Sequence, residues 1–184
     1  TIMELSSGEL HEIFNANNWR QTRQDYFDRI YRKTASLFRT ASEFGAILSG
    51  APERIVRVLH DYGYNIGMAF QIVDDILDFE GTEQEVGKPT GNDLRQGTIT
   101  LPALLLLDRY PNENLLNGLG SEDAHEACIT RAVEMVQNST IIRDSYSVAK
   151  EYVDRALMAL SKLPDNRSRQ SLTELAHYVT ERRK

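Results

Sequence analysis

Apolar residues recur at helical spacing along almost the whole chain, and no stretch alternates polar and apolar positions as a strand would. This pattern predicts a long helix over residues 21–48 that ends at Ser49 and Gly50. It predicts a second helix that begins near Pro52, where a first helical turn tolerates proline, and continues to Phe79. The fold class that this pattern predicts is all-α, a helical bundle.

The second half of the chain continues the helical pattern. A leucine-rich helix is predicted from Pro102 to about Tyr110, and Ser121, which two acidic residues follow, is predicted to begin another. Two more apolar stripes are separated by a turn at 164–166: Val148, Tyr152, Val153, Ala156, Leu157 and Leu160 in the first, and Leu172, Leu175, Ala176 and Val179 in the second. Because no linker or repeat interrupts the pattern, residues 1–184 are predicted to belong to one domain.

Three aspartates lie in the otherwise apolar segment 67–79. At helical spacing one stripe of this segment carries an amide and three acids, namely Gln71, Asp74, Asp75 and Asp78. No Lys or Arg lies between Arg57 and Lys88, so we expect a cation to come from elsewhere. Mg²⁺ suits such a site, because it prefers carboxylate oxygens and is completed by water and substrate phosphates. Taken alone, the pattern fits a solvated acidic helix face equally well.

Two lysines flank the acidic stripe. Lys33, followed by Thr34, lies in the middle of the preceding predicted helix, and Lys88 lies in a predicted glycine-rich loop between Glu80 and Thr98. A diphosphate that Mg²⁺ links to the aspartates has further oxygens, which ammonium groups would stabilise. Thr34 and Gln71 can donate additional hydrogen bonds. For each lysine alone, an exposed and solvated side chain is the simpler interpretation.

Composition narrows the class of protein. The net charge is -6 and the pI is about 5.3, which argues against a nucleic-acid partner. The longest apolar block, residues 101–107, is too short to cross a bilayer, so no transmembrane segment is predicted. A single cysteine, Cys128, excludes an internal disulfide framework. We expect a soluble protein of the cytoplasm or an organelle matrix, with peripheral membrane contact as an open alternative.

Three groups of residues together resemble the polyprenyl diphosphate synthases, the trans-prenyltransferases of the farnesyl, geranylgeranyl and long-chain type. The first is Tyr31-x-Lys33-Thr34-Ala35, and the second is Phe70-Gln71-x-x-Asp74-Asp75-x-x-Asp78. The third is Gly87-Lys88-Pro89-x-Gly91-x-Asp93-Leu94. Their joint occurrence in this order is specific, and the resemblance spans nearly all of the chain.

The resemblance implies an isoprenoid-synthase-type helical bundle and a prenyltransferase activity. Asp74, Asp75 and Asp78 match the second aspartate-rich motif of the family, which binds Mg²⁺. Lys33, Thr34, Gln71 and Lys88 match positions that contact the allylic diphosphate, and Asp93 matches an acid that supports the metal site. The implied reaction is the head-to-tail condensation of isopentenyl diphosphate with an allylic diphosphate. The implied assembly is a homodimer.

One family feature is not found in the sequence. The family carries a first aspartate-rich motif well ahead of a Gly-Glu-x-x-Gln segment, whereas this chain has Gly8-Glu9-Leu10-His11-Glu12 and no second Asp-Asp-x-x-Asp. The chain therefore resembles the carboxyl-terminal half of a synthase, and we expect it to be inactive alone. The alternatives are an accessory subunit of a heteromeric prenyltransferase, a non-catalytic helical interaction domain, and a class I terpene cyclase.

Overall fold

The computed structural model describes residues 1–80, 90–111, 115–121 and 124–182, apart from the side chains at 116 and 117. Within these ranges the secondary structure is helical and contains no strand, which confirms the predicted all-α class. No helix in the same ranges combines the length and the apolar character needed to span a membrane.

The first half contains α1 (Ile2–Phe14), α2 (Arg23–Ile30), η1 (Tyr31–Ala35), α3 (Ser36–Leu48) and α4 (Glu53–Glu80). The predicted helix over 21–48 is not one α-helix, because the π-helical turn η1 separates α2 from α3. The start of α2 is fixed by a capping box, in which Thr22 and Asp25 exchange side chain to backbone hydrogen bonds. Such π-helical turns are often found at functional sites, and this one carries Lys33 and Thr34.

The second half contains α6 (Asn92–Arg95), α7 (Leu101–Arg109), α8 (Leu115–Leu119), α9 (His125–Gln137), α10 (Ile141–Leu160) and α11 (Arg167–Glu181). The predicted helix start at Ser121 was wrong, because α9 begins at His125 with Ala124 as its N-cap. The predicted loop over residues 80–98 contains the short helix α6. Leu175, which was predicted to be in the core, is 48% exposed.

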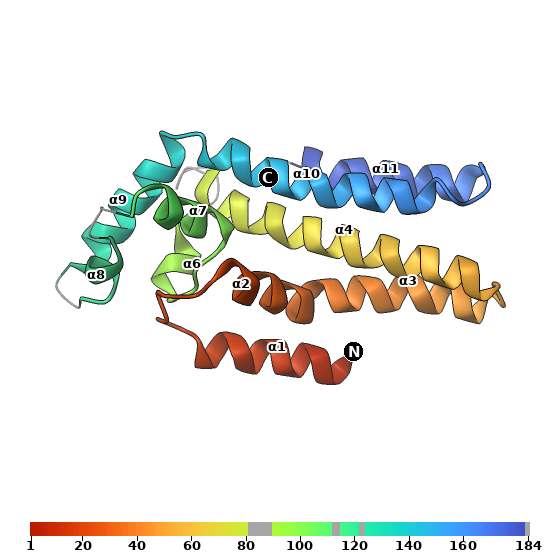
Figure 1. Cartoon of the computed structure of the whole chain (residues 1–184), viewed down its shortest axis with the longest axis horizontal. Coiled ribbons are helices and arrows are strands. Elements are labelled where there is room, and N and C mark those ends of the chain that lie inside the picture. The colour runs from red at the N-terminus through yellow and green to blue at the C-terminus, as the bar shows by residue number, and fades with distance from the viewer. Residues whose placement is uncertain (81–89, 112–114, 122–123, 183–184) are drawn as a thin grey trace.

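Helix α4 lies at the centre of the bundle (Figure 1), and its most extensive contacts are with α10 and α3. Helices α10 and α11 cover one side of α4, α2 and α3 lie on the other, and α6 to α9 gather at one end. Burial of α4 on several faces drives this packing, and its most deeply buried side chains include Met68, Ala69, Ile72, Val73 and Ile76.

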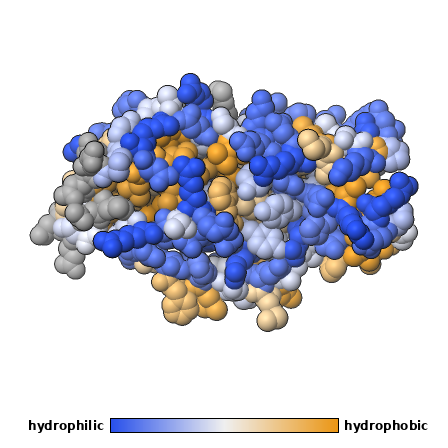
Figure 2. Space-filling view, in the orientation of Figure 1, coloured by the Kyte–Doolittle hydropathy of each residue, from blue (hydrophilic) through white to orange (hydrophobic). Residues whose placement is uncertain are grey.

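Helix α1 is the outermost element and packs mainly against η1 (Figure 1). Apolar side chains of α1 remain uncovered by the rest of the described chain, among them Ile2, Met3, Ile13 and Phe14. Figure 2 shows apolar surface along the lower edge of the molecule, where α1 lies.

Candidate diphosphate and metal site

The acidic stripe of α4 is not a uniformly solvated face. The side chain of Asp74 is 54% exposed, whereas Asp75 is only 4% exposed and belongs to the buried polar residues. Gln71 and Asp78 are partly buried. Because a carboxylate is seldom buried without polar partners, the environment of Asp75 argues against the interpretation as a solvated helix face.

Asp75 is held by a chain of hydrogen bonds. The Tyr26 hydroxyl donates to Oδ2 of Asp75 at 2.7 Å, and Nε2 of Gln71 donates to Oδ1 at 2.8 Å. The Thr34 hydroxyl in turn donates to Oε1 of Gln71 at 2.6 Å. Residues of helix α2, the turn η1 and helix α4 therefore hold this carboxylate together. Thr34 and Gln71, which were predicted to act as donors, both belong to this series of hydrogen bonds.

Asp74 is paired with a cation from the other end of the chain. Nη2 of Arg182 lies 3.2 Å from Oδ1 of Asp74 and 3.3 Å from the Phe70 carbonyl oxygen. The guanidinium group lies over the Phe70 ring at 4.1 Å from its centroid. A base from outside the acidic helix therefore offsets part of the stripe, because Arg182 is 108 positions away in sequence but adjacent in space.

Asp78 organises the segment that follows α4. Its two carboxylate oxygens accept hydrogen bonds from the backbone N–H groups of Asn92 and Asp93, each at 3.1 Å. The Asp78 carbonyl also accepts from the N–H of Gly91, whose positive φ of 74° is favourable only for residues such as glycine. Asp78 thus fixes the start of α6 and, with it, the position of Asp93.

Lys33 extends from η1 to a carboxylate of α1. Its Nζ lies 2.7 Å from both Oε1 and Oε2 of Glu12. The two elements approach closely because Gly8 has no side chain: a Cβ there would lie 2.9 Å from both Cβ of Arg32 and the backbone N of Lys33. The position of Glu12 beside Lys33 therefore depends on a helical glycine of α1.

A cavity of about 180 Å³ brings these groups together. Its polar and charged lining includes Glu12, Arg29, Lys33, Gln71, Asp74, Asp75 and Asp93. Arg29 is buried and already donates to Oε1 of Gln21 and to the Ile99 carbonyl. The cavity thus combines carboxylates from α1, α4 and α6 with an ammonium group from η1.

Two carboxyl groups of the cavity ionise less readily than in water. Burial raises the pKa of Asp75 to about 7, and the negative charge of Asp93 adds to this effect. Burial likewise raises the pKa of Asp93 to about 6, and the charges of Asp78, Asp74 and Glu12 contribute. A bound cation would favour the ionised form of both groups.

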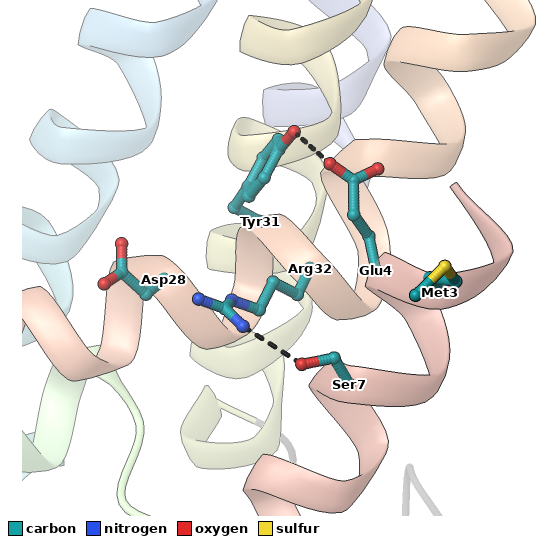
Figure 3. Close-up of a pocket in the computed structure, with 6 residues that line it drawn as sticks. All are labelled: Met3, Glu4, Ser7, Asp28, Tyr31 and Arg32. Carbon is teal, nitrogen blue, oxygen red and sulfur yellow. Dashed lines mark hydrogen bonds between the residues drawn. The ribbon is translucent and has the colours of Figure 1, made fainter.

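A larger cavity, of about 440 Å³, lies between α1 and the α2–η1 segment (Figure 3). It is lined by Met3, Glu4, Ser7, Asp28, Tyr31 and Arg32, none of which was predicted to be in the site. In Figure 3 the Tyr31 hydroxyl donates to Glu4 and Arg32 donates to Ser7, each at 3.0 Å. These bonds attach α1 to the turn that carries Lys33.

The structure brings most of the predicted site residues to one place. Lys33, Gln71, Asp74, Asp75 and Asp93 line the smaller cavity. Thr34 does not line this cavity but donates a hydrogen bond to Gln71, and Asp78 accepts one at the start of α6. Lys88 lies outside the described residues.

Sequence reasoning missed several described residues that contribute charge or hydrogen bonds to the site, among them Glu12, Tyr26, Arg29 and Arg182. A signal for Tyr26 and Arg29 was present in the sequence. Tyr26 precedes Lys33 by seven residues, and Arg29 precedes Lys33 by four, so helical spacing places all three on neighbouring turns of one face. For Arg182 no local signal exists.

The donor set fits Mg²⁺. Among the described residues, no group of three or more His, Cys, Asp or Glu side chains converges on a common point. Mg²⁺ does not require such a cage, because it is commonly bound by one or two carboxylates, water and substrate phosphates. Asp74 offers an accessible carboxylate at the cavity, and Asp75 and Asp93 add negative charge beside it.

The family model described as polyprenyl synthetase matches residues 1–144. Heptaprenyl diphosphate synthase component 2 of Bacillus subtilis is 40% identical over 183 residues, which are 100% of this chain and 52% of the relative. Solanesyl-diphosphate synthase 2 of Oryza sativa, a chloroplast protein, is 35% identical, and the match covers 98% of this chain and 44% of the relative. The chain spans about half the length of the curated relatives that it matches.

Solved structures of this family are likewise similar over nearly all of this chain and over little more than half of their own length. Heptaprenyl diphosphate synthase from Staphylococcus aureus is similar with a TM-score of 0.92 and 36% identity, over 98% of this chain and 57% of the other. Polyprenyl synthase from Caulobacter crescentus, in complex with calcium and isoprenyl diphosphate, is similar with a TM-score of 0.90 and 34% identity, over 99% of this chain and 56% of the other. The motifs, the all-α fold and these similarities together show that the chain belongs to the polyprenyl synthetase family.

Proposed function

We propose that the protein acts in the Mg²⁺-dependent, head-to-tail condensation of isopentenyl diphosphate with an allylic diphosphate, and that this chain holds the allylic diphosphate. The observation that carries the proposal is the convergence of Lys33, Gln71, Asp74 and Asp75 on one cavity. An ammonium group and oxygen ligands for a divalent cation are the two kinds of partner that a diphosphate needs.

Each residue has a role that follows from its position. Asp74 is the accessible carboxylate, and Asp75 is held in a fixed orientation behind it by Tyr26 and Gln71. Asp78 completes the motif and positions Asp93. Magnesium, when bound, neutralises the charge that builds on the leaving diphosphate.

The lysines bind phosphate oxygens in this proposal. Lys33 reaches the cavity from η1, beside the Thr34 and Gln71 pair. Lys88 is proposed as a second ammonium donor on the basis of its sequence position alone. The calcium and isoprenyl diphosphate in the Caulobacter crescentus structure support a divalent cation and a prenyl diphosphate as ligands.

Thermal unfolding in the presence of Mg²⁺ and inorganic pyrophosphate tests the proposal. A ligand that binds only the folded chain raises its stability by about 2.7 kcal/mol at a concentration of 100 Kd, so we expect a clear rise in Tm. Lys33→Gln should abolish most of this rise, whereas Lys150→Gln, at an exposed position of α10, should keep it. An unchanged Tm of the original chain with both ligands would refute the proposal and favour a non-catalytic interaction domain.

A heteromeric assembly is a second candidate. The Bacillus subtilis and Geobacillus stearothermophilus relatives are each named component 2 of a heptaprenyl diphosphate synthase, which favours a partner polypeptide for this chain as well. We expect the purified chain to show no turnover with Mg²⁺ and both diphosphates. Turnover by the chain alone would contradict the need for a partner.

A homodimer is the alternative assembly. Sedimentation of the purified chain distinguishes a homodimer from a monomer.

A further inference from the structure

Lys33 and Glu12 form an ion pair at the edge of the candidate site. Nζ of Lys33 lies at 2.7 Å from both carboxylate oxygens of Glu12. The side chains are 41% and 24% exposed, so water reaches the pair and its net stabilisation is modest. The pair can therefore open when a stronger anion competes for the ammonium group.

The charge balance of the cavity makes this competition important. Glu12, Asp74, Asp75 and Asp93 line the cavity, and among the described residues Arg29 and Lys33 are the two cations that line it. Arg29 is buried and donates to Gln21 and to the Ile99 carbonyl. Lys33 is thus the lining cation that an incoming anion can recruit, and Glu12 occupies it.

The charge of Glu12 also acts beyond Lys33. It is one of the charges that raise the pKa of Asp93, so its field extends across the cavity. An anion that enters the site therefore meets an ion pair of no net charge beside the three aspartates of the cavity.

We propose that Glu12 is a competing carboxylate that neutralises Lys33 in the ligand-free chain, that an entering diphosphate displaces it, and that Glu12 thereby sets how much Mg²⁺ the site requires. This inference rests on the proposed function, since it concerns the same diphosphate. With Glu12 present, diphosphate binding depends strongly on added cations. Without its charge, Lys33 is available from the start.

Calorimetric titration with inorganic pyrophosphate tests the inference. The variant Glu12→Gln keeps the shape of the side chain and an oxygen that accepts from Lys33 but removes the charge. At sub-saturating Mg²⁺ we expect Glu12→Gln to bind pyrophosphate about fivefold more tightly than the original chain, the equivalent of about 1 kcal/mol. The gain should shrink at saturating Mg²⁺, because bound cations then offset the charge of Glu12. Loss of structure cannot produce a gain in affinity.

Two further variants separate the contact from net charge. Glu9→Gln removes the same charge from an exposed position of α1 outside the cavity and should change the affinity by less than about twofold. In the Lys33→Gln background, Glu12→Gln relieves only the direct repulsion between the Glu12 charge and the diphosphate, so the gain should be less than about twofold. A fivefold gain that persists without Lys33 would overturn the displacement of Glu12 from the lysine.

Equal or weaker binding by Glu12→Gln would also overturn the inference, since Glu12 would then hold Lys33 in its binding position. That failure differs from failure of the proposed function. If the original chain binds no pyrophosphate at any Mg²⁺ concentration, the proposed function is refuted, and this inference with it.

Discussion

Asp75 illustrates the cost of concentrating carboxylates inside a bundle. It is 4% exposed, and hydrogen bonds from Tyr26 and Gln71 only partly offset the loss of water around its charge. Its pKa is therefore raised from 3.8 to about 7. A buried acid of this kind suits a site whose charge is completed by a cation.

This shift predicts a pH dependence of stability in the metal-free chain. Between pH 3.8 and about 7 the folded chain binds more protons at Asp75 than the unfolded chain does, so the free energy of unfolding falls as the pH rises through this range. We expect urea unfolding in EDTA to show higher stability at the acidic end of the range. Asp75→Asn should reduce the slope, because it removes the titrating group.

Asp154→Asn, on the exposed surface of α10, serves as the control and should keep the original slope. A slope that Asp75→Asn leaves unchanged would show that other groups cause the pH dependence.

At the scale of residues, the sequence was informative where chemistry is local. The spacing of Gln71, Asp74, Asp75 and Asp78 was enough to predict a shared stripe on a helix, and the structure places Gln71 in contact with Asp75. It could not predict that Asp75 is buried while Asp74 is exposed, because that difference depends on which helices cover α4. Arg182 was beyond local reasoning for the same reason.

Among the elements, the π-helical turn η1 positions two side chains of the candidate site. Its wide turn places Lys33 at the cavity and Thr34 against Gln71. Gly67 of α4 allows this approach, since a Cβ at that position would lie 2.6 Å from Cα of Ala35 and 2.9 Å from Cβ of Phe38. The distance between α4 and the η1–α3 segment is thus set by a glycine.

Gly67→Ala should therefore destabilise the chain by about 1–3 kcal/mol, the usual cost of inserting a methyl group into a packed contact. The measurement is urea unfolding of the purified variant. Gly45→Ala, in the exposed part of α3 where nothing lies within 4 Å, should instead stabilise by about 0.5–1 kcal/mol. If both substitutions stabilise, the helices can separate at no cost and the close approach is unimportant.

Helical periodicity predicted the existence of the long helices well, because each must bury an apolar stripe. It could not reveal η1, since one π-helical turn changes neither the composition nor the general spacing of apolar residues. The predicted start at Ser121 failed because Ala124, and not Ser121, is the N-cap of α9, and local capping preferences do not fix the helix boundary to within a few residues.

For the molecule as a whole, the site depends on segments from both ends of the described chain. Glu12 reaches it from α1, and Arg182 reaches it just after α11. Figure 1 shows α4 between these two layers. Association of distant segments around one central helix is the feature that sequence patterns alone do not predict.

The ion pair between Arg182 and Asp74 has a consequence at this scale. Arg182 occupies the carboxylate that the proposed function assigns to Mg²⁺. Because a bound cation and the guanidinium group compete for this carboxylate, we expect metal binding to weaken the pair and to displace Arg182.

A crystal structure of the chain with Mg²⁺ and pyrophosphate examines the proposed arrangement directly. We expect pyrophosphate in the cavity between α4 and η1, contacted by the Lys33 ammonium group, with a metal ion on the Asp74 carboxylate in place of Arg182. Pyrophosphate bound elsewhere, with Asp74 still paired to Arg182 and no metal at its carboxylate, would contradict the assignment of this cavity as the diphosphate site.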